Sequence, residues 1–313
     1  MDSAGLPPAA PAWRPDREVE IVAGTPAGGG QDRPARALVK VLEQGALAGV
    51  PLRVVNIPGA GGGNAWRYLT GHAGDAHRVA ISSPTLITNA LLGEDALDEQ
   101  SLTPLANLYT EYIAFLVPAS SGGDARDFAA RLARTPDRMP IALATARGNV
   151  NHIALARVMR QAGGRPRDLD LQIFDSARDA VAAMLQGESA AAVVTTISAA
   201  AEVRSGALRA LAVSAPSRLA PPFESVPTWT ELGVPCILGT WRGVVGPPEL
   251  PPAAVSFWEG ALAAAAATAQ WNEELRQQCW FNTFLDSAAT RAFLREEHTT
   301  MRDALSDIGM LSS

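Results

Sequence analysis

Short strand-like runs alternate with helical runs along most of this 313-residue chain, and this order limits the folds open to it. Strand-like runs span residues 19–23, 52–56 and 78–82, with helical patterns after them at 34–44, 64–69 and 85–92. The rhythm returns at 141–144, 171–174, 191–195 and 208–214. Alternation of this kind is typical of a mostly parallel sheet covered by helices.

Two apolar segments, 105–118 and 237–245, are candidates for crossings between two domains. Two crossings imply that the chain leaves the first domain, builds the second and returns. Prolines between 247 and 252 separate the second crossing from the tail that follows, because proline interrupts regular elements. The tail then shows helical patterns at 253–267, 271–278 and 287–308, and we expect these helices to pack on the first domain.

The composition excludes several classes of partner. A formal net charge of -6 argues against nucleic acid, because proteins that bind it usually carry a basic face. No apolar run is long enough to predict a membrane span. Residues 1–16 lack the features of a secretion signal, and we expect a flexible leader or a trimmed precursor. Cys236 and Cys279 lack neighbours at metal-ligand spacing, so we expect separate thiols, with a disulfide as the alternative, and no metal.

Two glycine-rich loops, at 24–32 and 56–64, each follow a strand-like run and open a helix. Such loops let backbone N–H groups converge on a guest, and the helix dipole behind them favours negative charge. The second loop has more glycines than a turn needs. The pair therefore predicts a site for a small anion. Asp32 is either the N-cap of the first helix or a ligand contact, and the two roles are compatible.

The same loops exclude familiar catalytic chemistry. Neither contains the lysine of a phosphate-binding loop, and Asn64 stands where a dinucleotide-binding motif needs its third glycine. Residues 187–191 lack the second glycine of a serine hydrolase elbow. His152, in the first turn of a helix, either ties its loop by a hydrogen bond or contacts a ligand. We expect a binding protein without a cofactor, and not an enzyme.

Further motifs follow the glycine loops: Leu-Arg-Ala-Leu-Ala-Val-Ser at 208–214, Val-Pro-Thr-Trp-Thr-Glu-Leu-Gly at 226–233 and a Trp-Arg-Gly-Val run that starts at Trp241. Their order resembles the extracytoplasmic solute receptors of tripartite tricarboxylate transporters, also called the Bug family. The resemblance covers nearly the whole chain. The Trp-Arg-Gly-Val run is most similar to the tricarboxylate-binding branch.

The resemblance implies an α/β fold of the two-lobed periplasmic binding protein type (type II). Each lobe would be a mostly parallel sheet flanked by helices, and two crossing strands would join them. Lobe one would comprise 17–112 plus 243–313, and lobe two 113–242. In lobe one, backbone N–H groups would hold a ligand carboxylate. The implied contacts there are Ala27, Gly28, Gly29, Gly30, Asp32, Gly59, Ala60, Gly61, Gly62, Ser83 and Thr85.

Lobe two departs from the family's pattern, because a glycine-containing stretch is replaced by side chains at 175–178. Asp175 facing the cleft would repel a second ligand carboxylate and Arg178 would attract one, each by about 1 to 4 kcal/mol at ~4 Å. The ligand is therefore a di- or tricarboxylate, or a monocarboxylate with a polar tail. The candidate contacts here are Asn149, Asn151, His152, Asp175, Ser176 and Thr195, with Trp241 from the second crossing.

We therefore expect a monomeric periplasmic receptor that delivers a small organic acid to the membrane permease subunits of a transporter. A solute-sensing protein that serves a membrane signalling partner has the same fold and is the alternative. An intracellular enzyme is a further alternative, for which the sequence offers no catalytic constellation. A bulky residue at Gly29 is expected to abolish binding while leaving the fold intact.

Overall fold

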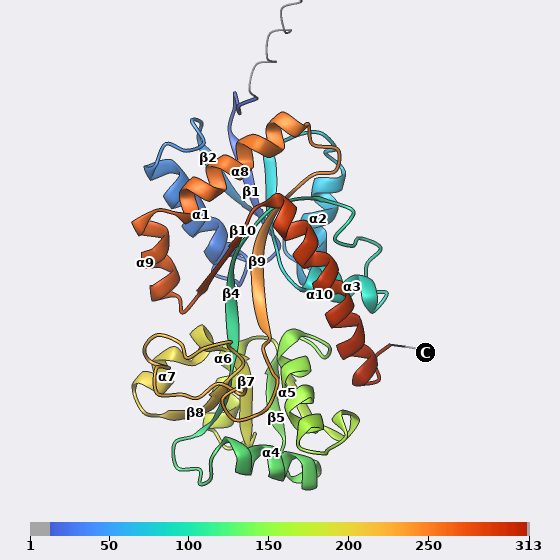
Figure 1. The fold of residues 1–313 in the computed structure, drawn as a ribbon, viewed down its shortest axis with the longest axis vertical. Helices are drawn as coiled ribbons and strands as arrows, with labels where there is room; N and C mark the ends of the chain where they lie inside the picture. The colour runs from blue at the N-terminus through green and yellow to red at the C-terminus, as the bar shows by residue number, and fades with distance from the viewer. Residues whose placement is uncertain (1–12, 312–313) are drawn as a thin grey trace, which may run out of the picture.

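A computed structural model gives the fold, and it describes residues 13–311. Figure 1 shows two lobes placed end to end and joined by two long strands. The predicted two-lobed α/β fold is confirmed, whereas the exact lobe bounds stay a prediction. Most of the expected leader, residues 1–12, lies outside the described residues. Trp13 is described, and its ring packs edge-on against His77 and Phe257 of the first lobe.

The first lobe is built on three parallel strands. Strand β1 (Val19–Ala23) lies between β2 (Leu52–Asn56) and β3 (Arg78–Ser82), and its buried, branched side chains suit a strand covered on both faces. The elements that follow these strands are α1 (Asp32–Gln44), the short helix η1 (Ala60–Gly62), α2 (Gly63–Thr70) and α3 (Thr85–Leu91).

The second lobe repeats this arrangement. Strand β5 (Ile141–Ala144) lies between β6 (Leu171–Phe174) and β7 (Ala191–Thr195), again in parallel. Strand β8 (Leu208–Val213) completes the lobe. Its helices are α4 (Ala125–Arg134), η2 (Pro136–Arg138), α5 (Val150–Gln161), η3 (Pro166–Asp168), α6 (Ala177–Leu185), η4 (Thr196–Ala199) and α7 (Ala200–Arg204).

Strands β4 (Thr103–Pro118) and β9 (Gly239–Gly246) form the two crossings, and they pair with each other in antiparallel fashion. Strand β9 also pairs with β3, and β4 pairs with β7 and β8, so the two parallel triplets become one continuous sheet. All of these contacts are antiparallel. The complete sheet is therefore mixed, with a parallel triplet at each end and antiparallel pairing between them.

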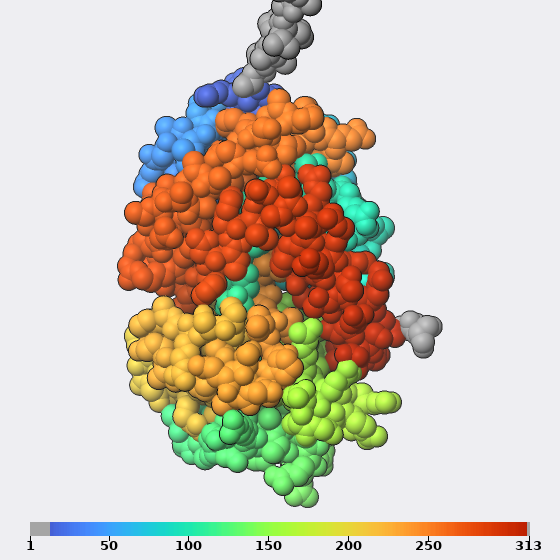
Figure 2. All heavy atoms as spheres, viewed as in Figure 1, coloured from blue at the N-terminus to red at the C-terminus, as the bar shows by residue number. Residues whose placement is uncertain are grey.

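The tail helices divide between the lobes. Helices α8 (Pro252–Ala266) and α9 (Ala269–Gln277) pack on lobe one as expected, and strand β10 (Phe281–Leu285) joins the edge of β4. Helix α10 (Ser287–Asp307) instead runs from lobe one to lobe two, as Figures 1 and 2 show.

The face of α10 explains why it reaches lobe two. Its buried side chains Leu294, Met301 and Leu305 share a hydrophobic core with Ile153 of α5. Near its end, Asp307 forms an ion pair with Arg160 of α5. Burial of each such apolar side chain contributes roughly 1.5–3 kcal/mol. The helix is therefore a third connection between the lobes.

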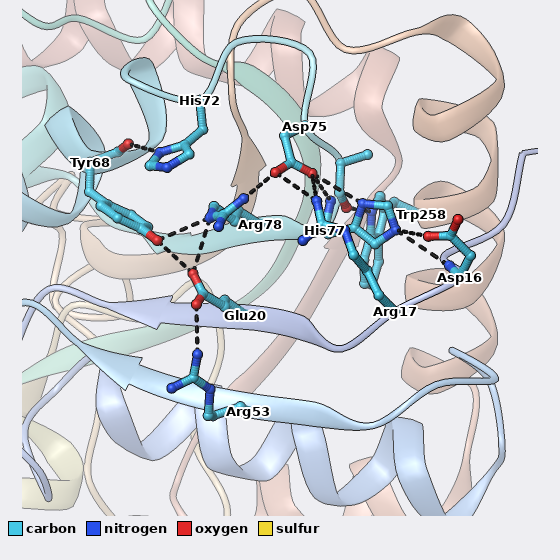
Figure 3. Close-up of polar contacts among 11 residues, drawn as sticks. Asp16, Arg17, Glu20, Arg53, Tyr68, His72, Asp75, His77, Arg78 and Trp258 are labelled. Carbon is cyan, nitrogen blue, oxygen red and sulfur yellow. Dashed lines mark hydrogen bonds and ion pairs between the residues drawn. The ribbon is translucent and has the colours of Figure 1, made fainter.

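The amino ends of the lobe-one strands carry a dense polar network (Figure 3). Asp75 accepts hydrogen bonds from Arg17 and from the backbone N–H of His77, and it pairs with Arg78. Glu20 accepts one from the Tyr68 hydroxyl at 2.7 Å. These charges therefore neutralise one another, while ligands of open α/β sheets bind at the opposite, carboxyl ends of the strands.

Within the described residues, no helix is both long and apolar enough to span a membrane.

Candidate functional site

A cavity of about 610 Å³ lies between the lobes at the carboxyl ends of their parallel strands. Figure 2 shows the surface hollowed between the lobes. Both lobes and both crossing strands contribute to the lining. It consists of Thr25, Pro26, Ala27, Gly28, Gly29, Gly30, Gln31, Arg33, Gly61, Ser83, Pro84, Thr85, Thr88, Glu111, Ala144, Thr145, Asn149, Val150, Asn151, Asp175, Ser176, Ala177, Thr195, Ile197, Ser198, Thr240, Arg242 and Trp280.

The first glycine loop is held by side chains at its two ends. The Thr25 hydroxyl accepts from the backbone N–H groups of Gln31 and Asp32, and the Gln31 side chain accepts from Gly24 N–H at 2.9 Å. The backbone N–H groups of Ala27 and Gly30 have no hydrogen-bond partner among residues 13–311. Two donors in a fixed loop therefore remain available to a guest in the cavity.

Asp32 lies behind this loop, outside the cavity lining. Its carboxylate is 1% exposed and accepts from Gly28 N–H at 2.7 Å, Asn56 Nδ2 at 2.8 Å and Arg36 Nε at 2.8 Å. Burial alone would raise its pKa, but the hydrogen bonds from Arg36, Gly28 and Asn56 outweigh burial and lower the pKa. Helix α1 begins without a side-chain cap, so Asp32 is not its N-cap. It shapes the loop instead.

The second glycine loop places Gly61 in the cavity lining, while Gly59, Ala60 and Gly62 lie outside it. Gly62 has a φ of 113°, and a Cβ there would approach the Gln31 side chain to 2.6 Å. Glycine therefore allows the two loops to meet. The Thr85 hydroxyl donates to Gly61 C=O at 2.7 Å and lies 2.8 Å from the Ser83 hydroxyl, which places both hydroxyls on the lobe-one wall.

In lobe two, the loop before α5 is tied by its own side chains. Asn149 caps α5, because its Oδ1 accepts from His152 N–H at 3.1 Å, while its Nδ2 donates to Ala144 C=O at 2.7 Å. The ring of His152 is buried outside the lining, and its Nδ1 accepts from Gly148 N–H at 2.9 Å. Burial, with a contribution from Arg147, lowers the His152 pKa to about 4. His152 therefore ties the loop as a neutral ring.

The loop before α6 places Asp175 and Ser176 in the lining. Ser176 caps α6 by accepting from Asp179 N–H at 3.1 Å, and its hydroxyl donates to the Asp179 carboxylate at 2.6 Å. The Thr195 hydroxyl lies 2.9 Å from that of Ser198, and both line the cavity. Arg178 lies outside the lining. The acidic member of this loop therefore faces the cavity, and the basic one does not.

The crossing strands contribute a floor to the cavity, and its residues Glu111 and Trp280 were not expected from the sequence. Arg242 of β9 donates from Nε to Gly30 C=O at 3.1 Å, and its Nη2 lies 4.0 Å from the Glu111 carboxylate of β4. Trp280 Nε1 donates to the same carboxylate at 3.1 Å. Burial raises the Glu111 pKa against the opposing effect of Arg242. A glutamate inside the apolar run 105–118 was the available signal. Trp241 is buried outside the lining and donates to Glu297.

The cavity thus brings together most of the residues expected from the sequence. Those in the lining are Ala27, Gly28, Gly29, Gly30, Gly61, Ser83, Thr85, Asn149, Asn151, Asp175, Ser176 and Thr195. Those outside it are Asp32, Gly59, Ala60, Gly62, His152 and Trp241. Cys236 and Cys279 are free thiols. Within residues 13–311, no three His, Cys, Asp or Glu side chains converge in an arrangement that would hold a metal ion.

Comparisons with known proteins agree with this geometry. A family model described as the tripartite tricarboxylate transporter family receptor matches residues 38–310. A search of curated proteins returned no match. Among solved structures, a TctC solute-binding protein from Polaromonas shares 25% identity, with 93% of this chain and 99% of that chain covered and a TM-score of 0.77.

Two further solved structures carry bound acids. MatC from Rhodopseudomonas palustris, solved with malate, shares 22% identity, with 93% of this chain and 99% of that chain covered and a TM-score of 0.76. Another R. palustris protein, solved with adipate, shares 20% identity, with 94% and 98% covered and a TM-score of 0.80. Both likenesses concern the fold.

Proposed function

Because this chain belongs to the receptor family of the tripartite tricarboxylate transporters, we propose that it is an extracytoplasmic receptor for a small organic carboxylate. The acid binds in the cavity between the lobes, and the receptor delivers it to the membrane subunits of the transporter. The family is one of receptors, which supports a role in binding over one in catalysis. We propose the periplasm as its location and a monomer as its working form.

One observation carries the choice of ligand class. The loop between β1 and α1 lines the cavity and leaves the N–H groups of Ala27 and Gly30 without a partner among residues 13–311, ahead of a helix without a side-chain cap. Backbone donors at a helix amino end favour an anion. The structures of relatives with malate and adipate support a carboxylate as that anion.

Closure of the lobes supplies the mechanism of delivery. A ligand that contacts both walls stabilises the closed arrangement over the open one, and the population shifts by its differential affinity for the two. The closed surface then differs from the open one and is the form that the membrane subunits recognise. Arg242 contributes at the floor, because it contacts Gly30 and lies beside Glu111 on the crossing strands.

The direct test is a binding panel on the purified chain, measured by calorimetry and by the shift in melting temperature. We expect at least one acid among mono-, di- and tricarboxylates and amino acids to bind near micromolar Kd, equivalent to about 8 kcal/mol. Bound ligand then raises the melting temperature. A flat response across the whole panel would sink the proposal.

Gly30 is the better position than Gly29 for a matched variant. A Cβ on Gly29 would lie 2.6 Å from the Thr25 hydroxyl that holds the loop, so bulk there disturbs the fold as well as binding. A Cβ on Gly30 would lie 3.2 Å from the Arg242 guanidinium, which can move. We expect Gly30→Val to weaken binding by about 100-fold or more, since one well-placed group contributes a few kcal/mol.

The control for this variant is Gly122→Val, where a Cβ meets nothing within 4 Å and which lies outside the cavity lining. It adds the same side chain to the same protein and should leave affinity unchanged. Equal affinity of the Gly30→Val variant and the wild type would remove the first glycine loop from the site.

A further inference from the structure

The lobe-two wall of the cavity presents one charged side chain among the described residues, Asp175. It follows β6 directly, is exposed, and makes no hydrogen bond or ion pair with the rest of residues 13–311. Arg178, the cation nearest in sequence, lies outside the lining. Asp175 therefore offers an unneutralised carboxylate to whatever occupies the cavity.

The helix amino ends of lobe two lie beside negative charge. Asn149 accepts from His152 N–H at the start of α5, and Ser176 accepts from Asp179 N–H at the start of α6. The N–H groups of Val150 and Ala177, both in the lining, have no partner among residues 13–311, so the charge of this wall and not a lack of donors distinguishes it. Asp179 adds a second negative charge beside Ser176. A ligand carboxylate placed here would face repulsion from Asp175 and Asp179.

Asn151 supplies a second acceptor on the same wall. Its side chain is only 8% exposed, lines the cavity, and has no hydrogen-bond partner among the described residues. A buried amide without a partner favours a ligand group that completes its hydrogen bonds. Its oxygen and the Asp175 carboxylate are both acceptors, which suits a ligand group rich in N–H donors.

The opposite wall has the complementary character. Arg33, in the first turn of α1, lines the cavity beside the unpaired N–H groups of the first glycine loop. At the floor, Glu111 is accompanied by Arg242 and Trp280, so it is not a free charge. The cavity is therefore positive toward lobe one and negative toward lobe two.

We infer that the ligand is an amino carboxylate, with its carboxylate on the lobe-one loops and its ammonium group between Asp175 and Asn151. This inference rests on the proposed function and narrows its ligand class. It also assigns a role to Asp175 as the residue that selects an ammonium group over a second carboxylate.

The test compares acids that carry an ammonium group with matched acids that lack it. Glutarate is paired with 4-aminobutanoate, and adipate with 5-aminopentanoate, because each pair shares its methylene chain. Common α-amino acids are compared with the same acids lacking the amine. Calorimetry on the wild type should show about 10- to 100-fold tighter binding of the aminated member of at least one pair, the range of a hydrogen-bonded charge contact.

Asp175→Asn keeps the shape of the side chain and removes its charge. We expect the preference for the aminated ligand to fall by at least tenfold, and the dicarboxylate to bind no worse than before. The control is Asp168→Asn, the same change on the same lobe, at a half-buried residue paired with Arg165 outside the cavity. It should retain the wild-type preference.

Two results would overturn the inference: dicarboxylates binding the wild type at least as tightly as their aminated counterparts, or a preference that survives Asp175→Asn. In either case, binding that is still lost in Gly30→Val leaves the proposed carboxylate receptor standing. Absence of binding by every acid overturns both. The wild-type comparison decides the matter even if the Asp175 variant is unstable.

Discussion

The two walls of the cavity have the same topology but different chemistry. On each, parallel strands end in loops that open helices, yet α1, η1, α2 and α3 of lobe one start without side-chain caps. In lobe two, Asn149 and Ser176 cap α5 and α6. A side-chain cap satisfies one amino-end donor of a helix and leaves the others to find partners elsewhere. The walls also differ in charge, because Arg33 lines lobe one and Asp175 lines lobe two. The difference teaches that topology places a site, and the side chains on each wall decide which charge it accepts.

As pH falls, we expect the lobe-two side of the cavity to be the first to lose stabilising interactions. His152 is buried and neutral, with a pKa of about 4 against about 6.5 when unfolded. Between these values the unfolded chain binds a proton that the folded chain does not, so stability falls as pH drops from about 6.5 to 4, by about 3 kcal/mol in all. Urea unfolding across this pH range measures the loss.

The variant His152→Gln should flatten this pH dependence. The difference between variant and wild type isolates the histidine from Glu111 and Glu297, whose pKa values are raised by burial and act in the opposite direction. An identical slope in both proteins would show that His152 is not buried and neutral.

Asp32 makes the corresponding test on the lobe-one side, at lower pH. Its pKa is lowered in the folded chain, so its contribution is present above about pH 4 and is lost as pH falls further. We expect Asp32→Asn to cost about 2 kcal/mol at neutral pH, because hydrogen bonds to a charged group are lost. Urea unfolding gives this cost, and no loss at neutral pH would contradict the role of Asp32 in shaping the loop.

Removal of a cap from lobe two should make its wall more like that of lobe one. Ser176→Ala removes the α6 cap and frees Asp179 N–H, at a cost of about 1 kcal/mol in stability. Binding of dicarboxylates relative to amino carboxylates should then rise. Thr268→Ala removes the α9 cap outside the cavity and is the matched control, with a similar cost and an unchanged preference. If both variants changed the ligand preference equally, the cap of α6 would have no specific role in selecting the ligand.

Local pattern was enough to predict much of the fold. Strands β1, β2 and β3 have the bounds expected from short branched runs between glycine and polar segments. Strand β10 and helix α4 were not predicted. The short run Phe281–Leu285 has no distinct periodicity, and it becomes a strand because the edge of β4 is available for pairing. That edge is set by residues far away in the sequence.

The candidate site was likewise predicted only in part. The glycine loops were predicted correctly because a few adjacent residues determine their backbone geometry. The roles of Asp32 and Glu111 were not, because each depends on partners distant in sequence: Asn56 for the former, Arg242 and Trp280 for the latter. Whether Asp175 or Arg178 lines the cavity also depended on the path of the chain from β6 into α6, which the sequence leaves open.

The run of α10 between the lobes has a practical consequence for measurement. Its last turn packs on lobe two, where Leu305 and Met310 lie close to Gly148 at the foot of the loop that carries Asn149. Any rotation of one lobe against the other must shift this contact. A fluorescent dye attached near the end of α10 would therefore report occupancy of the cavity from outside it. A bulky carboxyl-terminal fusion would restrict the same movement and weaken the signal.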